Sequence, residues 1–146
     1  LALTLVLSLR EQREDAFAAF RAGRMAEAES AFKAMVVDEP ENATAWLYLG
    51  RIHRRQERYR EAADALRRAQ RLDPRDPDVE RELGYLFLAL DRPESAAASF
   101  RRAVELQPEE RNNWIGLVLA LRAAGDPGAD SVLAEAPPEA RALLSR

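Results

Sequence analysis

The chain contains no cysteine, one histidine and a single lysine, and glycine is scarce among its 146 residues. Without cysteine there is no disulfide framework, no thiolate nucleophile and no cysteine-ligated metal site, although the compartment stays open. Scarce glycine beside abundant alanine favours helices over strands. A net charge of −3 argues against a general nucleic-acid-binding protein, whose surface would be basic. The sequence therefore predicts a helical protein with no nucleic-acid partner.

Signatures of catalysis are missing as well. The sequence has no glycine-rich phosphate-binding loop, no cluster of histidine with carboxylates and no metal-ligand spacing. His53, the only histidine, corresponds to Phe87 in the repeat described below, which favours a packed core residue over a catalytic one. We therefore expect no catalytic residue, no metal and no cofactor, and we infer that the chain is not an enzyme.

A period of about 34 residues runs through the chain. Residues 43–76 set a pattern of small, aromatic and proline positions that residues 77–110 copy closely and residues 9–42 copy in their second half. The positions in residues 43–76 are Trp46, Leu49, Gly50, His53, Ala62, Leu66, Ala69 and Pro74. Their equivalents in residues 77–110 include Leu83, Gly84, Phe87, Ala96, Phe100, Ala103 and Pro108, and those in residues 9–42 include Ala28, Phe32 and Pro40. Such a spacing indicates a repeat protein.

Each repeat is predicted to hold two antiparallel helices. Asn42 and Asp76 have the side chains of helix N-caps, and Pro74 ends the second helix because it lacks an N–H. Gly50 and Ala62, with almost no side chain, are expected to let the two helices cross closely.

The last unit, residues 111–146, keeps the pattern only at its start. Trp114 stands two periods after Trp46, but Val118 stands where glycine is expected. Asp126-Pro127 predicts the start of a further helix, which Pro137-Pro138 would cut to about nine residues. A short capping helix is expected at residues 139–144. Terminal repeats commonly depart from the pattern because one face meets water.

Residues 1–9 have leucine at every odd position, which is the period of a strand, although leucine favours helices. Three alternatives stay open: a helical extension that packs on the repeats, the end of a membrane anchor or signal segment, and a lone strand. Nine apolar residues cannot span a bilayer, which takes about 20. If Leu1 to Leu9 were exposed, they would form an apolar patch, so self-association is a further possibility.

The tryptophan, Leu-Gly, alanine, aromatic and proline positions over about residues 9–124 resemble the tetratricopeptide repeat. The resemblance implies an all-α, right-handed α-solenoid of antiparallel helix pairs, with about three full repeats, a degenerate fourth and a C-terminal capping helix. We expect one domain, 1–146, with an apolar extension or anchor remnant at 1–8, repeats at 9–42, 43–76 and 77–110, and a partial repeat and cap at 111–146.

The resemblance also implies a protein–protein interaction module, an adaptor or assembly scaffold, that binds a peptide or protein segment in a concave groove. It implies no catalysis. The alternatives are a membrane-anchored or periplasmic assembly factor and the recognition module of a larger enzyme. The compartment is accordingly either cytoplasmic or, if residues 1–9 end an anchor, membrane-anchored or periplasmic.

The predicted groove lies on the helical face beside the core positions. Arginine can fork onto a carboxylate and aromatic side chains can anchor a ligand, so this face suits an acidic-hydrophobic peptide or a C-terminus. The alternative to a binding groove is that these arginines form the solvated face of an arginine-rich protein. The predicted groove residues are Arg13, Phe17, Phe20, Leu47, Arg51, Arg54, Arg81, Tyr85, Leu88, Ile115 and Arg122.

One subfamily of tetratricopeptide repeats grips the terminal carboxylate of a peptide at set groove positions. In this sequence those positions hold Arg13, Phe17, Tyr48, Asp78 and Glu82. Only Arg13 suits a carboxylate, and the two acidic residues would repel it. We therefore do not expect that mechanism.

Overall fold

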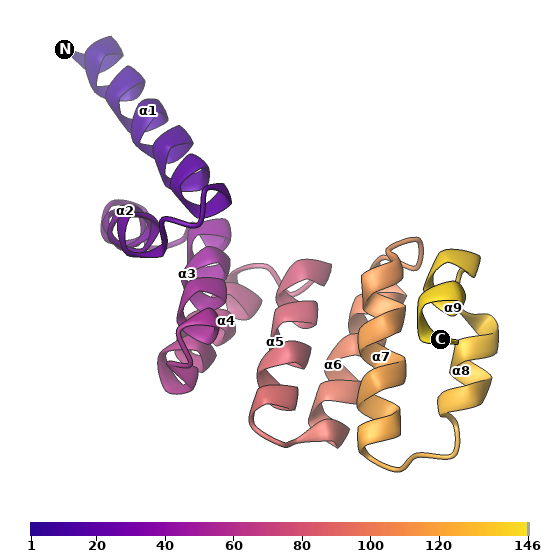
Figure 1. Cartoon of the computed structure of the whole chain (residues 1–146). Helices are drawn as coiled ribbons and strands as arrows, with labels where there is room; N and C mark the ends of the chain where they lie inside the picture. Colours follow the sequence, from indigo (N-terminus) through magenta and orange to yellow (C-terminus); the bar gives the residue numbers. More distant parts are fainter. Residues whose placement is uncertain (146) are drawn as a thin grey trace. The chain divides into compact units, whose positions relative to one another are not determined.

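The structure is a computed structural model that describes residues 1–145, apart from the side chains of residues 4–7 and 9. Over this part of the chain it is built from helices without a strand (Figure 1). No helix of the described residues is long and apolar enough to cross a membrane. The helices are α1 (Ala2–Arg21), α2 (Met25–Asp38), α3 (Ala43–Arg55), α4 (Tyr59–Leu72), α5 (Pro77–Ala89), α6 (Pro93–Leu106), α7 (Arg111–Ala123), α8 (Ala129–Glu135) and α9 (Pro138–Leu144).

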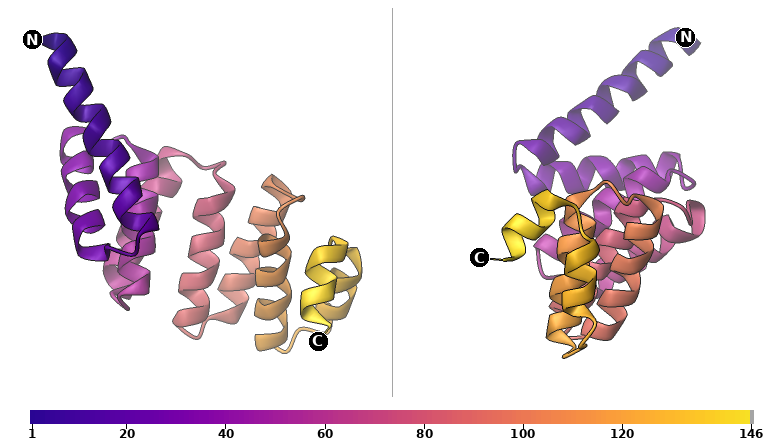
Figure 2. Two further views of the ribbon diagram at one scale, coloured as in Figure 1. Left: turned by 45° about the horizontal axis from the view of Figure 1, so that its top comes forward. Right: turned by 90° about the vertical axis from the view of Figure 1, so that its right-hand side faces the viewer.

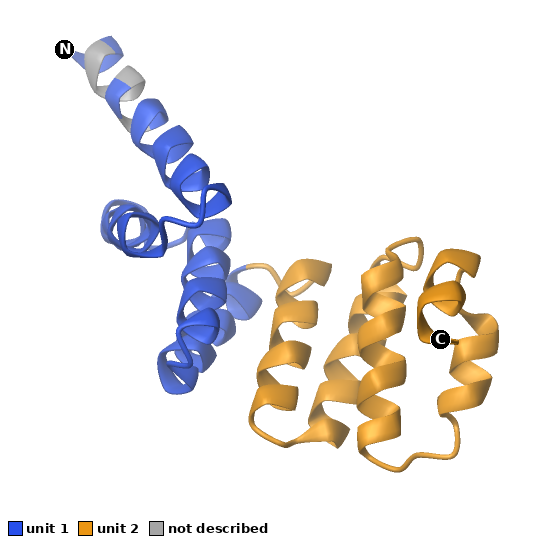
Figure 3. Cartoon of the chain, viewed as in Figure 1, with its two compact units in different colours: residues 1–72 blue, residues 73–146 orange. Residues whose placement is uncertain are grey.

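The helices form two compact units, residues 1–72 with α1 to α4 and residues 73–146 with α5 to α9 (Figure 3). Within each unit, helices that follow one another in the sequence pack together, and the two helices of a pair run antiparallel (Figure 2). The prediction of an all-α array of helix pairs is confirmed. That residues 1–146 act as one domain stays a prediction.

The first helix settles one of the alternatives for residues 1–9. Because α1 begins at Ala2 and continues to Arg21, the strand alternative is wrong, and the helix propensity of leucine outweighs its period of two. Leu1 and Leu3 are exposed. The predicted packing of the extension on the repeats falls largely on side chains outside the described residues.

The predicted caps of α3 and α5 are confirmed. Asn42 Oδ1 accepts a hydrogen bond of 3.0 Å from Ala45 N. Asp76 Oδ1 accepts one of 2.8 Å from Asp78 N, and Pro77 takes the first helical position.

The helix expected to start at Asp126-Pro127 begins two residues later and is shorter than predicted. Asp126 Oδ1 accepts a hydrogen bond of 2.8 Å from Gly128 N, which closes a turn before α8 can begin. As a result α8 has 7 residues. The capping helix α9 starts at Pro138, one residue before the predicted position.

One backbone feature repeats in all four helix pairs. The turn after the first helix of each pair contains a residue in the left-handed conformation, at Gly23, Glu57, Asp91 and Gly125, with φ of 76°, 60°, 54° and 67°. These positions lie one period apart, so the period extends into the last pair. The amide of the next residue closes each turn on a carbonyl of the helix, in the pairs Arg24 to Ala19, Arg58 to His53, Arg92 to Phe87 and Asp126 to Leu121.

Glycine allows close helix packing in both units. A Cβ added to Gly50 would lie 2.5 Å from Leu66 Cγ, so the nearest neighbour of Gly50 is Leu66. In unit 2, Gly84 and Gly116 both approach Phe100. As predicted, Val118 replaces the glycine of the earlier repeats, and it is buried. Gly116, which approaches Phe100 on the preceding helix, was not predicted.

Candidate functional site

The predicted groove aromatics of α1 belong in part to the core of unit 1. The ring centroids of Phe17 and Phe20 each lie 4.9 Å from that of Tyr48 on α3, with the rings edge to face. Phe32 of α2 stacks on the same tyrosine at 5.0 Å. Phe17 and Phe20 are half-buried, so they join the first two repeats and leave only part of each ring for a partner.

The predicted arginines of unit 1 are held by neighbours. The Arg51 guanidinium lies 5.0 Å from the centre of the Tyr48 ring, and Arg13 forms an ion pair with Glu39. Arg54 is half-buried. Arg55, which was not among the predicted residues, has its guanidinium 4.7 Å from the centre of the Phe20 ring. Arginine and aromatic side chains therefore do alternate on this part of the chain.

Leu47 does not offer its side chain to a partner, because it is only 3% exposed. The prediction assumed one buried stripe on α3. The structure buries Leu49, Gly50 and His53 of that stripe and also Ala45, Leu47 and Ile52. The buried arc of the helix is therefore wider than the spacing suggested.

Unit 2 contains a polar cluster built around one buried amide. Asn113 is 0% exposed, and its Nδ2 donates hydrogen bonds of 3.1 Å to the carbonyls of Ala103 and Gln107. Its Oδ1 accepts a bond of 3.0 Å from Arg81 Nη1, and Arg81 also pairs with Asp78. The Arg81 side chain is 15% exposed. The buried amide therefore fixes the direction of a predicted groove guanidinium.

Asn113 was not among the predicted groove residues, although a signal was present. The equivalent positions one and two periods earlier are Val79 and Ala45, which are both fully buried and apolar. A lone polar side chain at an apolar position of a repeat has to find hydrogen-bond partners in the interior.

The remaining predicted groove residues of unit 2 lie on α5 and α7, which contact each other directly. Tyr85 packs edge to face on Phe100, with 5.0 Å between ring centroids, and Leu88 and Ile115 are half-buried. Leu119, one turn after Ile115, is 45% exposed. Arg122 Nη1 donates a bond of 3.4 Å to the carbonyl of Leu144. The face therefore presents partly exposed apolar side chains beside Arg81.

A network of charged side chains joins the two helix pairs of unit 1. Glu29 Oε1 lies 2.8 Å from Arg58 Nη1 and 2.5 Å from Lys33 Nζ, and Glu29 Oε2 accepts a bond of 3.3 Å from Gln56. The hydrogen bond from Lys33, with those from Arg58 and Gln56, lowers the pKa of Glu29 to about 2, although burial acts in the opposite direction. This network ties the α3–α4 turn to α2.

His53 borders the same network. It is 7% exposed, which confirms the prediction of a packed residue, and its Nε2 lies 3.4 Å from Glu29 Oε1. Neither ring nitrogen makes a hydrogen bond with good geometry to the described residues.

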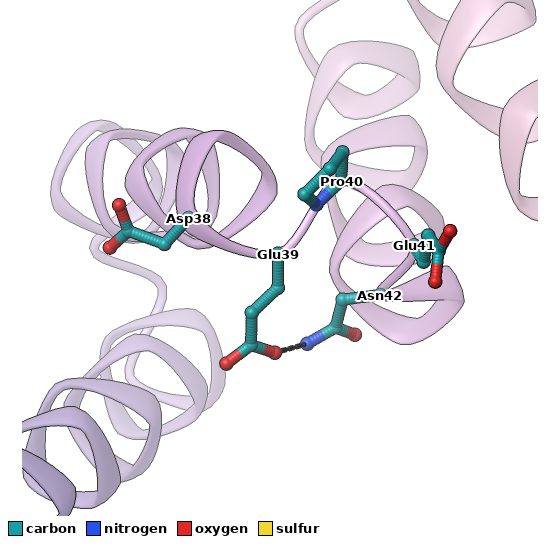
Figure 4. A pocket seen from close by; sticks show the side chains of 5 residues that line it. All are labelled: Asp38, Glu39, Pro40, Glu41 and Asn42. Carbon is teal, nitrogen blue, oxygen red and sulfur yellow. Dashed lines mark hydrogen bonds between the residues drawn. The ribbon is translucent and has the colours of Figure 1, made fainter.

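The α2–α3 loop borders a hollow of about 440 Å³, lined by Asp38, Glu39, Pro40, Glu41 and Asn42. Asn42 Nδ2 donates a hydrogen bond of 2.9 Å to Glu39, and the three carboxylates point away from one another (Figure 4). They do not converge on a common point, so this loop is not arranged to hold a cation. Among the described residues no group of histidine and acidic side chains could hold a metal ion.

The loops before α3 and α7 each accept a hydrogen bond from a tryptophan side chain. Trp46 Nε1 donates a hydrogen bond of 2.9 Å to the carbonyl of Pro40, and Trp114 Nε1 donates one of 2.7 Å to the carbonyl of Pro108. The indole rings thus close the start of α3 and of α7 against the loop that comes before each of them.

Comparison with known proteins gives matches along most of the chain. A family model described as tetratricopeptide repeat matches residues 16–77 and 81–146. The protein O-mannosyl-transferase TMTC1 of Mus musculus is 30% identical over 99 residues, which cover 65% of this chain and 10% of that protein. The chain spans about a tenth of the length of the curated relatives it matches.

Solved structures share the fold. An O-GlcNAc transferase mutant of Thermobaculum terrenum is 30% identical with a TM-score of 0.75, and the match covers 80% of this chain and 22% of that one. The first tetratricopeptide domain of Spaghetti (RPAP3), bound to an HSP90 peptide, is 19% identical with a TM-score of 0.75, and covers 80% of this chain and 93% of that one. The matched part of this chain consists of repeats, which are generally protein-interaction modules.

Proposed function

Because the chain belongs to the tetratricopeptide repeat family, we propose that it acts as an adaptor or assembly scaffold that binds a segment of a partner protein. The solved tetratricopeptide domain that holds an HSP90 peptide supports a peptide as the class of ligand. The fold alone does not select a partner, so the ligand class depends on the residues of this chain.

The observation that carries the proposal is the fixed direction of Arg81. Asn113 and Asp78 hold the guanidinium on the face of α5, so little side-chain freedom is lost when a carboxylate binds it. Leu88 and Ile115 lie half-buried on the α5–α7 face and offer apolar contact area. We propose that this face binds a peptide segment in which acidic and apolar side chains alternate.

Unit 1 has a face of its own with the same chemistry. Arg51 keeps its charge while it packs on the Tyr48 ring, and Phe20 remains half-buried beside Arg55. Gripping a terminal carboxylate is not part of the proposal, because two of the positions that such a site uses hold acidic residues. Asp78 is paired with Arg81, and Glu82 is buried.

A binding assay tests the proposal. A fluorescein-labelled peptide of alternating glutamate and leucine should bind more tightly than a matched peptide of alternating lysine and leucine, as measured by fluorescence anisotropy. Charge reversal at Arg81 should weaken binding of the acidic peptide to unit 2 by about tenfold, and charge reversal at Arg51 should weaken its binding to unit 1 by a similar factor, while the helical content stays unchanged. Charge reversal at Arg67, which is exposed on α4, is the matched control.

Equal binding of the two peptides, or an affinity that does not change on reversal of Arg81, would overturn the groove assignment. The circular dichroism spectrum of each variant separates a lost contact from lost folding.

A second candidate is self-association through the start of α1, where Leu1 and Leu3 are exposed. Light scattering of the chain with and without residues 1–9 distinguishes the two candidates, because a monomer in both forms removes self-association.

The context of the module is a separate proposal. One curated relative is named as a transferase and is about ten times longer than the matched part. This supports the recognition module of a larger enzyme as an alternative to a free adaptor or a membrane-anchored assembly factor.

A further inference from the structure

The first helix pair carries a cavity that the groove does not include. It has a volume of about 350 Å³, which lies within the range of roughly 300 to 1,000 Å³ typical of ligand pockets. Its apolar lining comes from α2 and its rim is polar. The lining residues are Gln12, Asp15, Ala31, Ala34, Met35 and Asp38.

The repeat register identifies what this cavity lacks. Gln12 of α1 stands one period before Trp46, and Asp15 stands one period before Leu49. In the second pair Leu49 is 2% exposed, and Trp46 is half-buried with its indole bonded to the carbonyl of Pro40. The first pair therefore has a short amide and a carboxylate where the second pair has an indole and a leucine.

The floor of the cavity follows the same register. Ala31 and Met35 of α2 correspond to Ala65 and Ala69 of α4, which are 3% and 0% exposed. In the last pair Trp114 again occupies the tryptophan position, with its indole bonded to the carbonyl of Pro108. Tryptophan therefore takes this position in two of the four pairs, whereas the third pair has the buried Glu80 there.

The rim gives the cavity a charge. Asp15 and Asp38 are both exposed, and no described side chain forms an ion pair with either of them. Two carboxylates beside an apolar floor favour a ligand that joins an aromatic ring to a positive charge.

We propose that this cavity is a socket for the tryptophan side chain of a partner protein, presented on a segment that carries an arginine or lysine beside it. The indole fills the place that Gln12 leaves open, and the basic side chain lies between Asp15 and Asp38. The site is separate from the α5–α7 face and takes a ligand of opposite charge, so either proposal stands if the other fails.

A second copy of this chain is a poor occupant. Its own tryptophans, Trp46 and Trp114, both donate their indole N–H to a proline carbonyl, and each would have to give up that bond to enter the socket. The occupant is therefore a different protein.

The probe is the acetylated, amidated dipeptide tryptophan–arginine, added to the full ¹⁵N-labelled chain and followed by amide chemical shifts. Saturable shifts are expected at Gln12, Ala31 and Ala34, with a dissociation constant on the order of millimolar for so small a ligand. The alanine–arginine and tryptophan–glutamate dipeptides should bind at least about tenfold more weakly.

The decisive variant is Gln12→Trp, which restores the indole of the repeat within the chain itself. It should raise the melting temperature and abolish the shifts caused by the dipeptide. Glu11→Trp places the same side chain at a neighbouring exposed position and should leave dipeptide binding unchanged. Ala34→Trp fills the cavity from α2 and serves if the first variant does not fold.

The charges are tested by replacing Asp15 and Asp38 together with asparagine. This change should weaken the tryptophan–arginine dipeptide severalfold and leave a tryptophan–alanine dipeptide unaffected. The proposal is overturned if the chain shows no saturable shifts at about 20 mM dipeptide, if Gln12→Trp binds it as the unmodified chain does, or if the socket proves to be covered by a second copy in solution.

Discussion

Gly116 and Phe100 approach each other so closely that a Cβ on Gly116 would lie 2.2 Å from Phe100 Cε1. Gly84 approaches the opposite edge of the same ring, where a Cβ would lie 2.7 Å from Cε2. The Phe100 side chain is fully buried between α5 and α7. The two glycines therefore set how closely these helices pack in unit 2.

Replacing Gly116 with alanine should lower the free energy of unfolding by about 1 to 3 kcal/mol, because the added methyl group overpacks the Phe100 ring. The expectation runs against helix propensity, which favours alanine by about 1 kcal/mol. Urea denaturation measures the change. The loss should shrink when Phe100 is also replaced by leucine, and equal losses in both backgrounds would show that the ring is not the cause.

Replacing Glu57 with glycine should raise the free energy of unfolding by about 0.5 to 1 kcal/mol, because Glu57 has a φ of 60° that glycine adopts without a Cβ penalty. Asp91→Gly should act in the same way. Thermal denaturation measures both. Ala124→Gly is the matched control, since Ala124 stands at the same place of the last turn as Gln56 does in the second, has a φ of −78°, and glycine there should only destabilise. A destabilised Glu57→Gly variant would contradict the prediction.

Replacing Asn113 with aspartate should destabilise unit 2 by about 2 to 4 kcal/mol, even though the two side chains have nearly the same shape. The carboxylate cannot donate to the carbonyls of Ala103 and Gln107 and would face both at the distance where Nδ2 now donates. Asn112→Asp, on the exposed neighbouring residue, should be tolerated. Chemical denaturation of the two variants gives the comparison.

Ionised Glu29 should make the stability of unit 1 depend on pH. Its pKa in the folded chain, about 2, lies below the ordinary value of 4.5. The stabilisation is therefore complete above about pH 4.5 and is lost as the pH falls toward 2. The urea midpoint of the unmodified chain should fall across this pH window. Glu29→Gln should have a lower urea midpoint at pH 7, and that midpoint should change less between pH 4.5 and pH 2. If the curves of Glu29→Gln and the unmodified chain run parallel, another carboxylate is responsible. Glu27→Gln, on the same helix, is the control.

The sequence predicted those features that depend on local chemistry. Asn42 and Asp76 were identified as caps because their side chains bond to amides a few residues away. The repeat period was visible because small and aromatic residues recur in it. Leu47 was wrongly predicted to line the groove, because its burial depends on how many helices surround α3. The apolar pattern of a single helix does not show how many neighbours that helix has.

Partners distant in the sequence were the other source of error. Gly116 was overlooked because its role is set by Phe100 on α6, and the equivalent positions of the earlier repeats hold Tyr48 and Glu82. Asn113 was overlooked because its partners lie at the end of α6 and on α5. The repeat showed that Asn113 is a polar residue at an apolar position, but it did not show which segments supply its partners.

The two indole hydrogen bonds have a practical consequence. Trp46 belongs to unit 1 and Trp114 to unit 2, so each unit has one tryptophan, anchored to a proline carbonyl. Replacing one tryptophan with phenylalanine leaves an emission spectrum that reports on the other unit. The red shift on release of the remaining indole into water then follows that unit's unfolding without an added dye.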